Sequence, residues 1–139
     1  MRKTRIATLW LDGCSGCHMS LLDIDERLLT IADEIDLVYS PLVDAKEFPE
    51  DVDVTLVEGA IATDEDIEKI ALVRSRTKLL VALGDCAVTG NVPAMRNNFS
   101  LEEVLSRGYV ESATANPGVP ILEVPKLNAK VIPVQRYRK

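Results

Sequence analysis

The sequence predicts an α/β fold built around a flavodoxin-like, doubly wound parallel sheet. Short apolar runs of strand length alternate along the chain with segments whose apolar residues recur at helical spacing. The apolar runs are nearly continuous, which is typical of parallel strands buried on both faces. The 139 residues suffice for one core, so we expect a single domain over residues 1–139.

The first half of the chain predicts three strands and one helix. Residues 6–11 form the first strand, and a loop rich in glycine and cysteine follows. Apolar residues at helical spacing then predict a helix over residues 20–33, whose early turns are acidic. Residues 35–39 and 52–57 predict the second and third strands, with a turn at residues 48–51 between them.

A near capping box predicts where the next helix begins. Thr63 is a good N-cap and Asp66 follows three residues later, so we expect a helix over residues 64–74. Its spacing places Ile67, Ile70 and Ala71 on one face. Residues 78–83 then predict the fourth strand.

The last third of the chain predicts less regular structure. Ser100 and Glu103 form a second capping box, and Gly108 is expected to end that short helix in the left-handed conformation. Residues 112–125 are rich in proline, glycine and small residues and predict a loop. Residues 131–134 predict a fifth strand, which Pro133 confines to a sheet edge or a strand end.

Composition narrows the class of protein. A net charge of −6 argues against binding to nucleic acid or to an anionic membrane surface, and an aromatic content of 4% argues against base stacking. No stretch approaches the roughly 20 apolar residues of a membrane span, and the N-terminus does not resemble a secretory signal. We therefore expect a cytoplasmic protein with reduced thiols.

Three cysteines follow predicted strands. Cys14 and Cys17 lie in the loop after the first strand, and Cys86 follows the fourth. Loops at the carboxyl ends of parallel strands border one crevice, so these three thiols are expected to converge. Three converging thiolates favour a metal or iron–sulfur site, with flanking glycines for tight turns and backbone amides for hydrogen bonds to sulfur.

Other interpretations of the cysteines remain open at this point. A redox dithiol, haem attachment through C-x-x-C-H, zinc held by the three cysteines with His18, and plain burial each fit part of the pattern. His18 is more simply a side chain at a helix start. Glu58 and Asp85 also follow strands, where each could enter the crevice or lie in water.

The motifs together resemble the small subunit of the soluble, bidirectional NAD-linked nickel–iron hydrogenase. The resemblance runs in order from the first strand to about Tyr109, and the segments that carry it are residues 13–20, 22–26, 57–61, 84–88 and 91–97. It implies an electron-transfer subunit, an oxidoreductase component without activity alone. Its partners would be a large subunit carrying nickel–iron and diaphorase subunits that reduce NAD.

The resemblance also implies a proximal 4Fe–4S cluster whose ligands include Cys14, Cys17 and Cys86. Family members supply the fourth ligand from a later Gly-Cys-Pro-Pro segment, which this sequence lacks. We therefore expect a chain truncated at its C-terminus, with the fourth ligand outside it. No motif supports FMN, because residues 13–17 occupy the place of a flavodoxin phosphate loop.

Two alternatives accompany this interpretation. One is a cytoplasmic zinc- or thiol-bearing binding module without redox function. The other is an electron-transfer subunit of similar fold from the quinone-reducing complex I, a family that tends to carry adjacent cysteines, whereas two residues separate Cys14 from Cys17.

Overall fold

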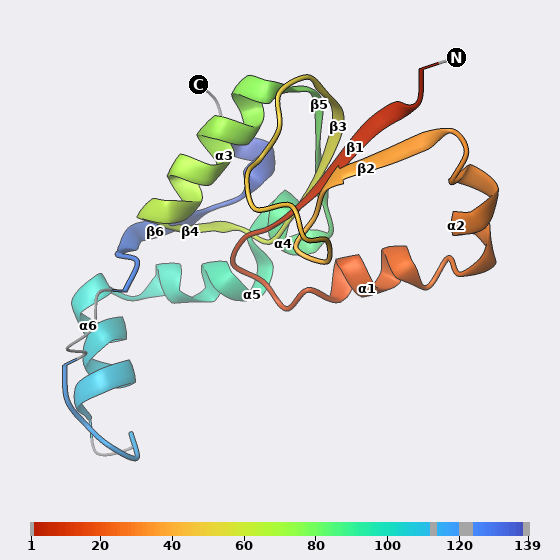
Figure 1. Cartoon of the computed structure of the whole chain (residues 1–139). Helices are drawn as coiled ribbons and strands as arrows, with labels where there is room; N and C mark the ends of the chain where they lie inside the picture. Colours follow the sequence, from red (N-terminus) through yellow and green to blue (C-terminus); the bar gives the residue numbers. More distant parts are fainter. Residues whose placement is uncertain (1, 112–113, 120–123, 138–139) are drawn as a thin grey trace.

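A parallel four-stranded sheet forms the centre of the computed structural model, which describes residues 2–111, 114–119 and 124–137 (Figure 1). Its strands are β1 (Thr4–Trp10), β2 (Ile35–Tyr39), β3 (Val52–Glu58) and β5 (Thr77–Leu83). Their order across the sheet is β2-β1-β3-β5. Counted along this sheet alone the order is 2-1-3-4, as in flavodoxin-like sheets, so the predicted fold class is confirmed.

Helices and short turns connect the strands. They are α1 (Gly16–Leu22), α2 (Glu26–Ile31), α3 (Asp64–Arg76), α4 (Asp85–Thr89), α5 (Asn91–Ala94), α6 (Leu101–Leu105), and the 3₁₀ turns Met95–Asn98 and Val134–Arg136. Figure 1 shows α1, α4 and α5 at the lower end of the sheet, while α6 projects away from it. Among the described residues, no helix has the length and apolar character that crossing a membrane requires.

The helix expected over residues 20–33 is wrong in extent. The chain forms α1 and α2 instead, and residues 23–25 separate them. Asp25 has φ +52° and ψ −119°, a backbone conformation that cannot continue an α-helix. The spacing of apolar residues runs through this break, and for that reason periodicity alone did not reveal it.

Helix α3 begins as its sequence predicts and ends two residues later. Thr63 accepts a hydrogen bond from the Asp66 main chain, and the Asp66 carboxylate accepts one from the Thr63 main chain. The buried side of α3 differs from the prediction, because Ile70 and Val73 face the core whereas Ile67 is 40% exposed. Ile70 and Val73 pack against the sheet residues that form the main core, which include Ala7, Leu9, Val52 and Val57.

A second, two-stranded sheet replaces the expected fifth strand of the central sheet. Strand β6 (Leu127–Ile132) pairs antiparallel with β4 (Ile61–Thr63), a strand that the sequence analysis missed. The prediction of a strand over residues 131–134 is therefore wrong in extent, since Val134 lies in a 3₁₀ turn. Pro133 directly follows β6, at a strand end as expected.

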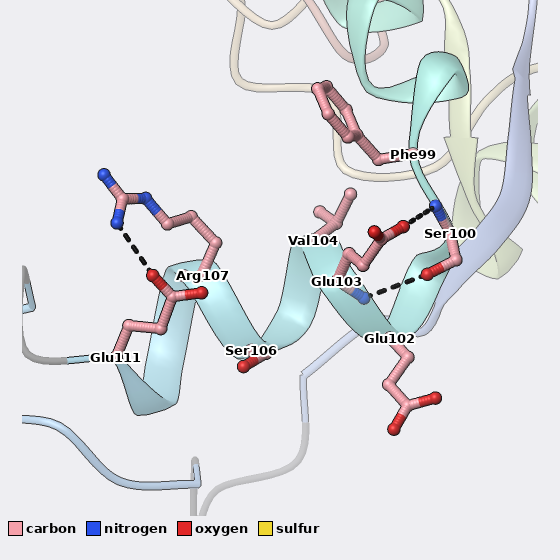
Figure 2. Close-up of a pocket in the computed structure, with 9 residues that line it drawn as sticks. Phe99, Ser100, Glu102, Glu103, Val104, Ser106, Arg107 and Glu111 are labelled. Atoms are coloured by element: carbon pink, nitrogen blue, oxygen red, sulfur yellow. Dashed lines mark hydrogen bonds and ion pairs between the residues drawn. The ribbon is translucent and has the colours of Figure 1, made fainter.

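The projecting segment around α6 confirms one prediction and corrects another. Ser100 and Glu103 form a complete capping box, which Figure 2 shows with both hydrogen bonds. Gly108 does not end the helix in the left-handed conformation, because it lies inside a π-helical turn, Ser106–Val110. Residues 114–119, 124 and 125 carry no helix or strand, as predicted, and the remaining residues of the loop expected over 112–125 lie outside the described residues.

Candidate functional site

Three strands of the central sheet end side by side. In the sheet register, Trp10 of β1 lies opposite Glu58 of β3, and Glu58 lies opposite Leu83 of β5. The loops that leave these strands therefore start at the same edge of the sheet. This alignment brings the loop that carries Cys14 and Cys17 to the same sheet edge as Cys86, which is far from them in the sequence.

The three cysteines lie at this edge and form no disulfide. Cys14 is exposed in the loop after β1, while Cys17 and Cys86 are partly buried in the first turns of α1 and α4. Burial raises the pKa of the Cys17 thiol above 9.0, and the charges of Glu58, Cys14 and Cys86 add to that rise. The pKa of Cys86 is raised by burial and then by Cys14. Each sulfur thus lies within electrostatic range of the others.

A main-chain hydrogen bond opposes the rise in the pKa of Cys86. A main-chain hydrogen bond from Val92 lowers the pKa of the Cys86 thiol, although burial outweighs it. A main-chain N–H that donates to sulfur stabilises the thiolate form, which is the form that binds metal. The segment after α4 therefore presents a donor to the sulfur, as expected for residues around an iron–sulfur site.

Missing side chains make room for the sulfurs. A Cβ at Gly84 would lie 2.0 Å from Cys17 Sγ, and a Cβ at Gly16 would lie 3.3 Å from Cys14 Sγ. Gly84 also has φ +83°, which side chains rarely adopt. The sulfur of Cys17 consequently occupies a space that only glycine at position 84 leaves open.

Backbone pairing fixes the start of the cysteine loop. Asp12 and Ala60 exchange main-chain hydrogen bonds of 3.1 and 2.7 Å, which join the loop after β1 to the segment after β3. Within the loop itself the left-handed residue is Ser15, at φ +64°, rather than Gly13 or Gly16. The expectation that these two glycines provide the tight turn is therefore wrong.

Glu58 and His18 form a buried pair that the sequence analysis did not identify. Glu58 is 3% exposed and His18 is 1% exposed, so a carboxylate in water is the wrong interpretation of Glu58. Glu58 Oε2 lies 2.5 Å from His18 Nδ1 and accepts the His18 main-chain N–H at 2.9 Å. The His18 ring packs edge-on against Trp10, with ring centroids 5.3 Å apart. His18 lies in the first turn of its helix, as expected.

Asp85 lies at the cysteine edge, where its charge adds to the raised pKa of Cys17 and Cys86, whereas the surface hollows lie elsewhere. Asp85 is exposed, and its carboxylate accepts a hydrogen bond from the Thr89 hydroxyl. Two hollows flank α6, one of them shown in Figure 2, and neither lining contains a cysteine. The chemistry of the cysteine edge therefore lies elsewhere than in these hollows.

Three cysteine thiols are the donor chemistry that an iron–sulfur cluster uses. In the described part of the chain, no three or more His, Cys, Asp or Glu side chains are placed to hold one metal ion. A tetrahedral zinc site needs every sulfur within about 2.3 Å of one centre. A polynuclear cluster is broader, so its thiolate ligands stand further apart than those of a single ion.

Comparison with known proteins gives a consistent result. Residues 14–134 match the family described as NADH ubiquinone oxidoreductase, 20 kDa subunit. The delta subunit of the NAD-reducing hydrogenase HoxS from Cupriavidus necator is 42% identical over 99% of this chain and 68% of its own length. A subunit of the F420-non-reducing hydrogenase vhu from Methanocaldococcus jannaschii is 39% identical over 97% of this chain and 48% of its own length.

A solved structure agrees with these sequence relatives. A chain of the NAD⁺-reducing [NiFe]-hydrogenase in the H₂-reduced state matches with a TM-score of 0.84 and 38% identity, over 99% of this chain and 79% of that one. Several of the relatives are much longer, since this chain spans only 44% of an F420-non-reducing hydrogenase subunit from Methanothermobacter marburgensis.

Proposed function

We propose that this chain, which belongs to the family of the NADH ubiquinone oxidoreductase 20 kDa subunit, is the electron-transfer small subunit of a NAD-linked nickel–iron hydrogenase. The observation that carries the proposal is the position of the three cysteines after β1 and β5, whose carboxyl ends lie at one edge of a sheet similar to that of the NAD⁺-reducing hydrogenase. Two relatives whose names identify them as hydrogenase subunits support the same assignment.

The three cysteine thiolates would hold a 4Fe–4S cluster, with a fourth ligand from outside these 139 residues. Such a cluster accepts and passes on one electron at a time. Gly16 and Gly84 leave space beside two of the sulfurs, and the hydrogen bond from Val92 favours the thiolate of Cys86. The partly buried setting of Cys17 and Cys86 limits the access of water.

The assembly follows from the same assignment. A separate large subunit carrying nickel and iron would supply electrons from hydrogen, and diaphorase subunits in the cytoplasm would deliver them to NAD. The cysteine edge would face the large subunit, because electron transfer requires the two metal centres to approach each other.

Anaerobic reconstitution with iron and sulfide tests the ligand set. The chain and its Cys14→Ser, Cys17→Ser and Cys86→Ser variants are compared by iron and acid-labile sulfide content. We expect each serine variant to lose most of the bound iron, while Ser20→Ala, on the exposed surface of α1, loads as the unaltered chain does. Zinc without sulfide would indicate the thiol-bearing binding module instead, and equal iron in a variant would remove that cysteine from the ligand set.

A further inference from the structure

The buried pair of Glu58 and His18 connects two distant parts of the chain. Glu58 is the last residue of β3, and His18 immediately follows Cys17 in the first turn of α1. One oxygen, Glu58 Oε2, binds both the main-chain N–H and the ring Nδ1 of His18, at 2.9 and 2.5 Å. Within the described residues, the Glu58 carboxylate has hydrogen bonds to no other residue.

Helix α1 lacks the cap that its own sequence would ordinarily provide. A helix leaves its first N–H groups without partners, and the N-cap side chain usually accepts from the second or third helical residue. Ser15 stands at the N-cap but its side chain makes no such bond. Glu58 accepts from the third helical residue instead, so a carboxylate from another strand replaces the local cap.

We propose that Glu58 is a positioning residue. It caps α1 and hydrogen-bonds to the His18 ring, and it thereby holds the cysteine loop in its ligand-binding conformation. The proposal rests on the proposed function, since it concerns the loop that carries two of the three cluster ligands. A buried carboxylate is unfavourable unless it is hydrogen-bonded, so the burial of Glu58 depends on His18 staying in place. Cys17 is thereby fixed through its immediate neighbour.

The ring of His18 adds a second anchor. It is almost completely buried and packs edge-on against Trp10 at the end of β1. Its Nε2 is buried without a hydrogen-bond partner among the described residues, so the Glu58 bond is the one polar contact found for the ring there. The segment from Trp10 to His18 is thus fixed to the sheet at both ends. Cys14 and Cys17 lie within this segment.

The charge of Glu58 reaches the cysteines as well. Its carboxylate is, after burial, the largest cause of the raised pKa of Cys17. A fixed negative charge beside a cluster opposes the addition of an electron and therefore lowers its midpoint potential. Geometry and charge can be separated, because glutamine at position 58 keeps an acceptor oxygen of the same reach and removes the charge.

The experiment uses anaerobically reconstituted full chain, with iron and sulfide content and the midpoint potential followed by electron paramagnetic resonance (EPR). For Glu58→Leu we expect iron affinity to fall by about tenfold, as for other residues that orient metal ligands. For Glu58→Gln we expect iron content close to that of the unaltered chain and a more positive potential. Asp85→Asn removes an exposed carboxylate from the same edge and should leave iron content unchanged.

Each outcome has one meaning. Equal iron affinity in the folded Glu58→Leu variant overturns the proposal. If circular dichroism shows that this variant does not fold, Glu58→Gln decides, and loss of iron or an unchanged potential in that variant overturns the proposal. Failure of the unaltered chain to take up iron and sulfide, when a soluble thiol is supplied for the fourth position, would instead contradict the proposed function before any variant is compared.

Discussion

At the scale of single residues, Gly84 is where the candidate site tolerates a side chain least. Alanine there would place its Cβ 2.0 Å from Cys17 Sγ on a backbone with φ +83°. We expect Gly84→Ala to lower the free energy of unfolding by about 1–3 kcal/mol through backbone strain, and to reduce iron uptake by displacing the sulfur. Urea unfolding and iron analysis measure the two effects.

Gly108→Ala is the matched control for that substitution. A Cβ at Gly108 would meet no atom within 4 Å, and its φ is not positive. This variant should keep both stability and iron uptake. Full iron uptake and unchanged stability in Gly84→Ala would contradict the packing described for Cys17.

The raised pKa values of Cys17 and Cys86 make the metal-free chain sensitive to alkali. Burial favours their neutral thiols in the folded state, so the unfolded chain loses these protons first as the pH rises past about 9.0. The stabilisation is present below that pH and is lost as the pH rises through the folded-state values. We expect urea midpoints between pH 8 and 10.5 to fall less steeply in a Cys17→Ser, Cys86→Ser double variant; identical slopes would argue against the shifts.

The sequence predicts the positions of the cysteines but not the buried pair beside them. The cysteines could be placed because each follows an apolar run, and parallel strands bring their carboxyl ends together. The pairing of Glu58 with His18 could not be predicted, because residues 40 apart meet only through the strand register. The one available signal was a glutamate at the end of a strand whose last two residues before it, Leu56 and Val57, are apolar.

At the scale of secondary structure, Asp53 joins the amino ends of three strands. Its carboxylate accepts the main-chain N–H of Arg5 at 2.9 Å and pairs with Lys78 and Arg2 at 2.6 and 3.0 Å. The hydrogen bond from Lys78 is the largest cause that lowers the Asp53 pKa, to about 2 from 3.8. The stabilisation is therefore present above pH 3.8 and is lost as the pH falls through about 2.

Asp53→Asn should lower the melting temperature at pH 7, and the difference from the unaltered chain should shrink as the pH falls towards 2. Asp44→Asn is the control, because Asp44 pairs with Lys46 on the open surface. Thermal unfolding followed by circular dichroism across this pH range checks both variants. A constant difference at all pH values would show that Asp53 acts through something other than its charge.

The elements themselves could be predicted unevenly. The strands of the central sheet and both capping boxes could be predicted, because apolar runs and N-cap side chains are local features of the sequence. The break at Asp25 and the pairing of β4 with β6 were not, because one depends on a single backbone angle and the other joins residues about 65 apart. Three-residue β4 is also too short to show a period.

At the scale of the whole molecule, the proposed function gives this chain an electron-transfer centre and assigns hydrogen activation to a separate subunit. All three cysteines are assigned to the proposed cluster, which leaves no thiolates for a nickel–iron site. Hydrogen-dependent dye reduction should therefore be absent from the isolated chain and appear when the large subunit is added. Activity in the isolated chain, free of other subunits, would contradict this division of labour.

The most direct test of the central claim is EPR spectroscopy of the hydrogenase complex purified with this chain, before and after exposure to hydrogen. We expect hydrogen to generate a reduced iron–sulfur signal that is lost, together with NAD reduction, when Cys17 is replaced by serine, while nickel is retained in the large subunit. An unchanged signal and unchanged NAD reduction in the Cys17→Ser complex would show that electrons do not pass through this chain.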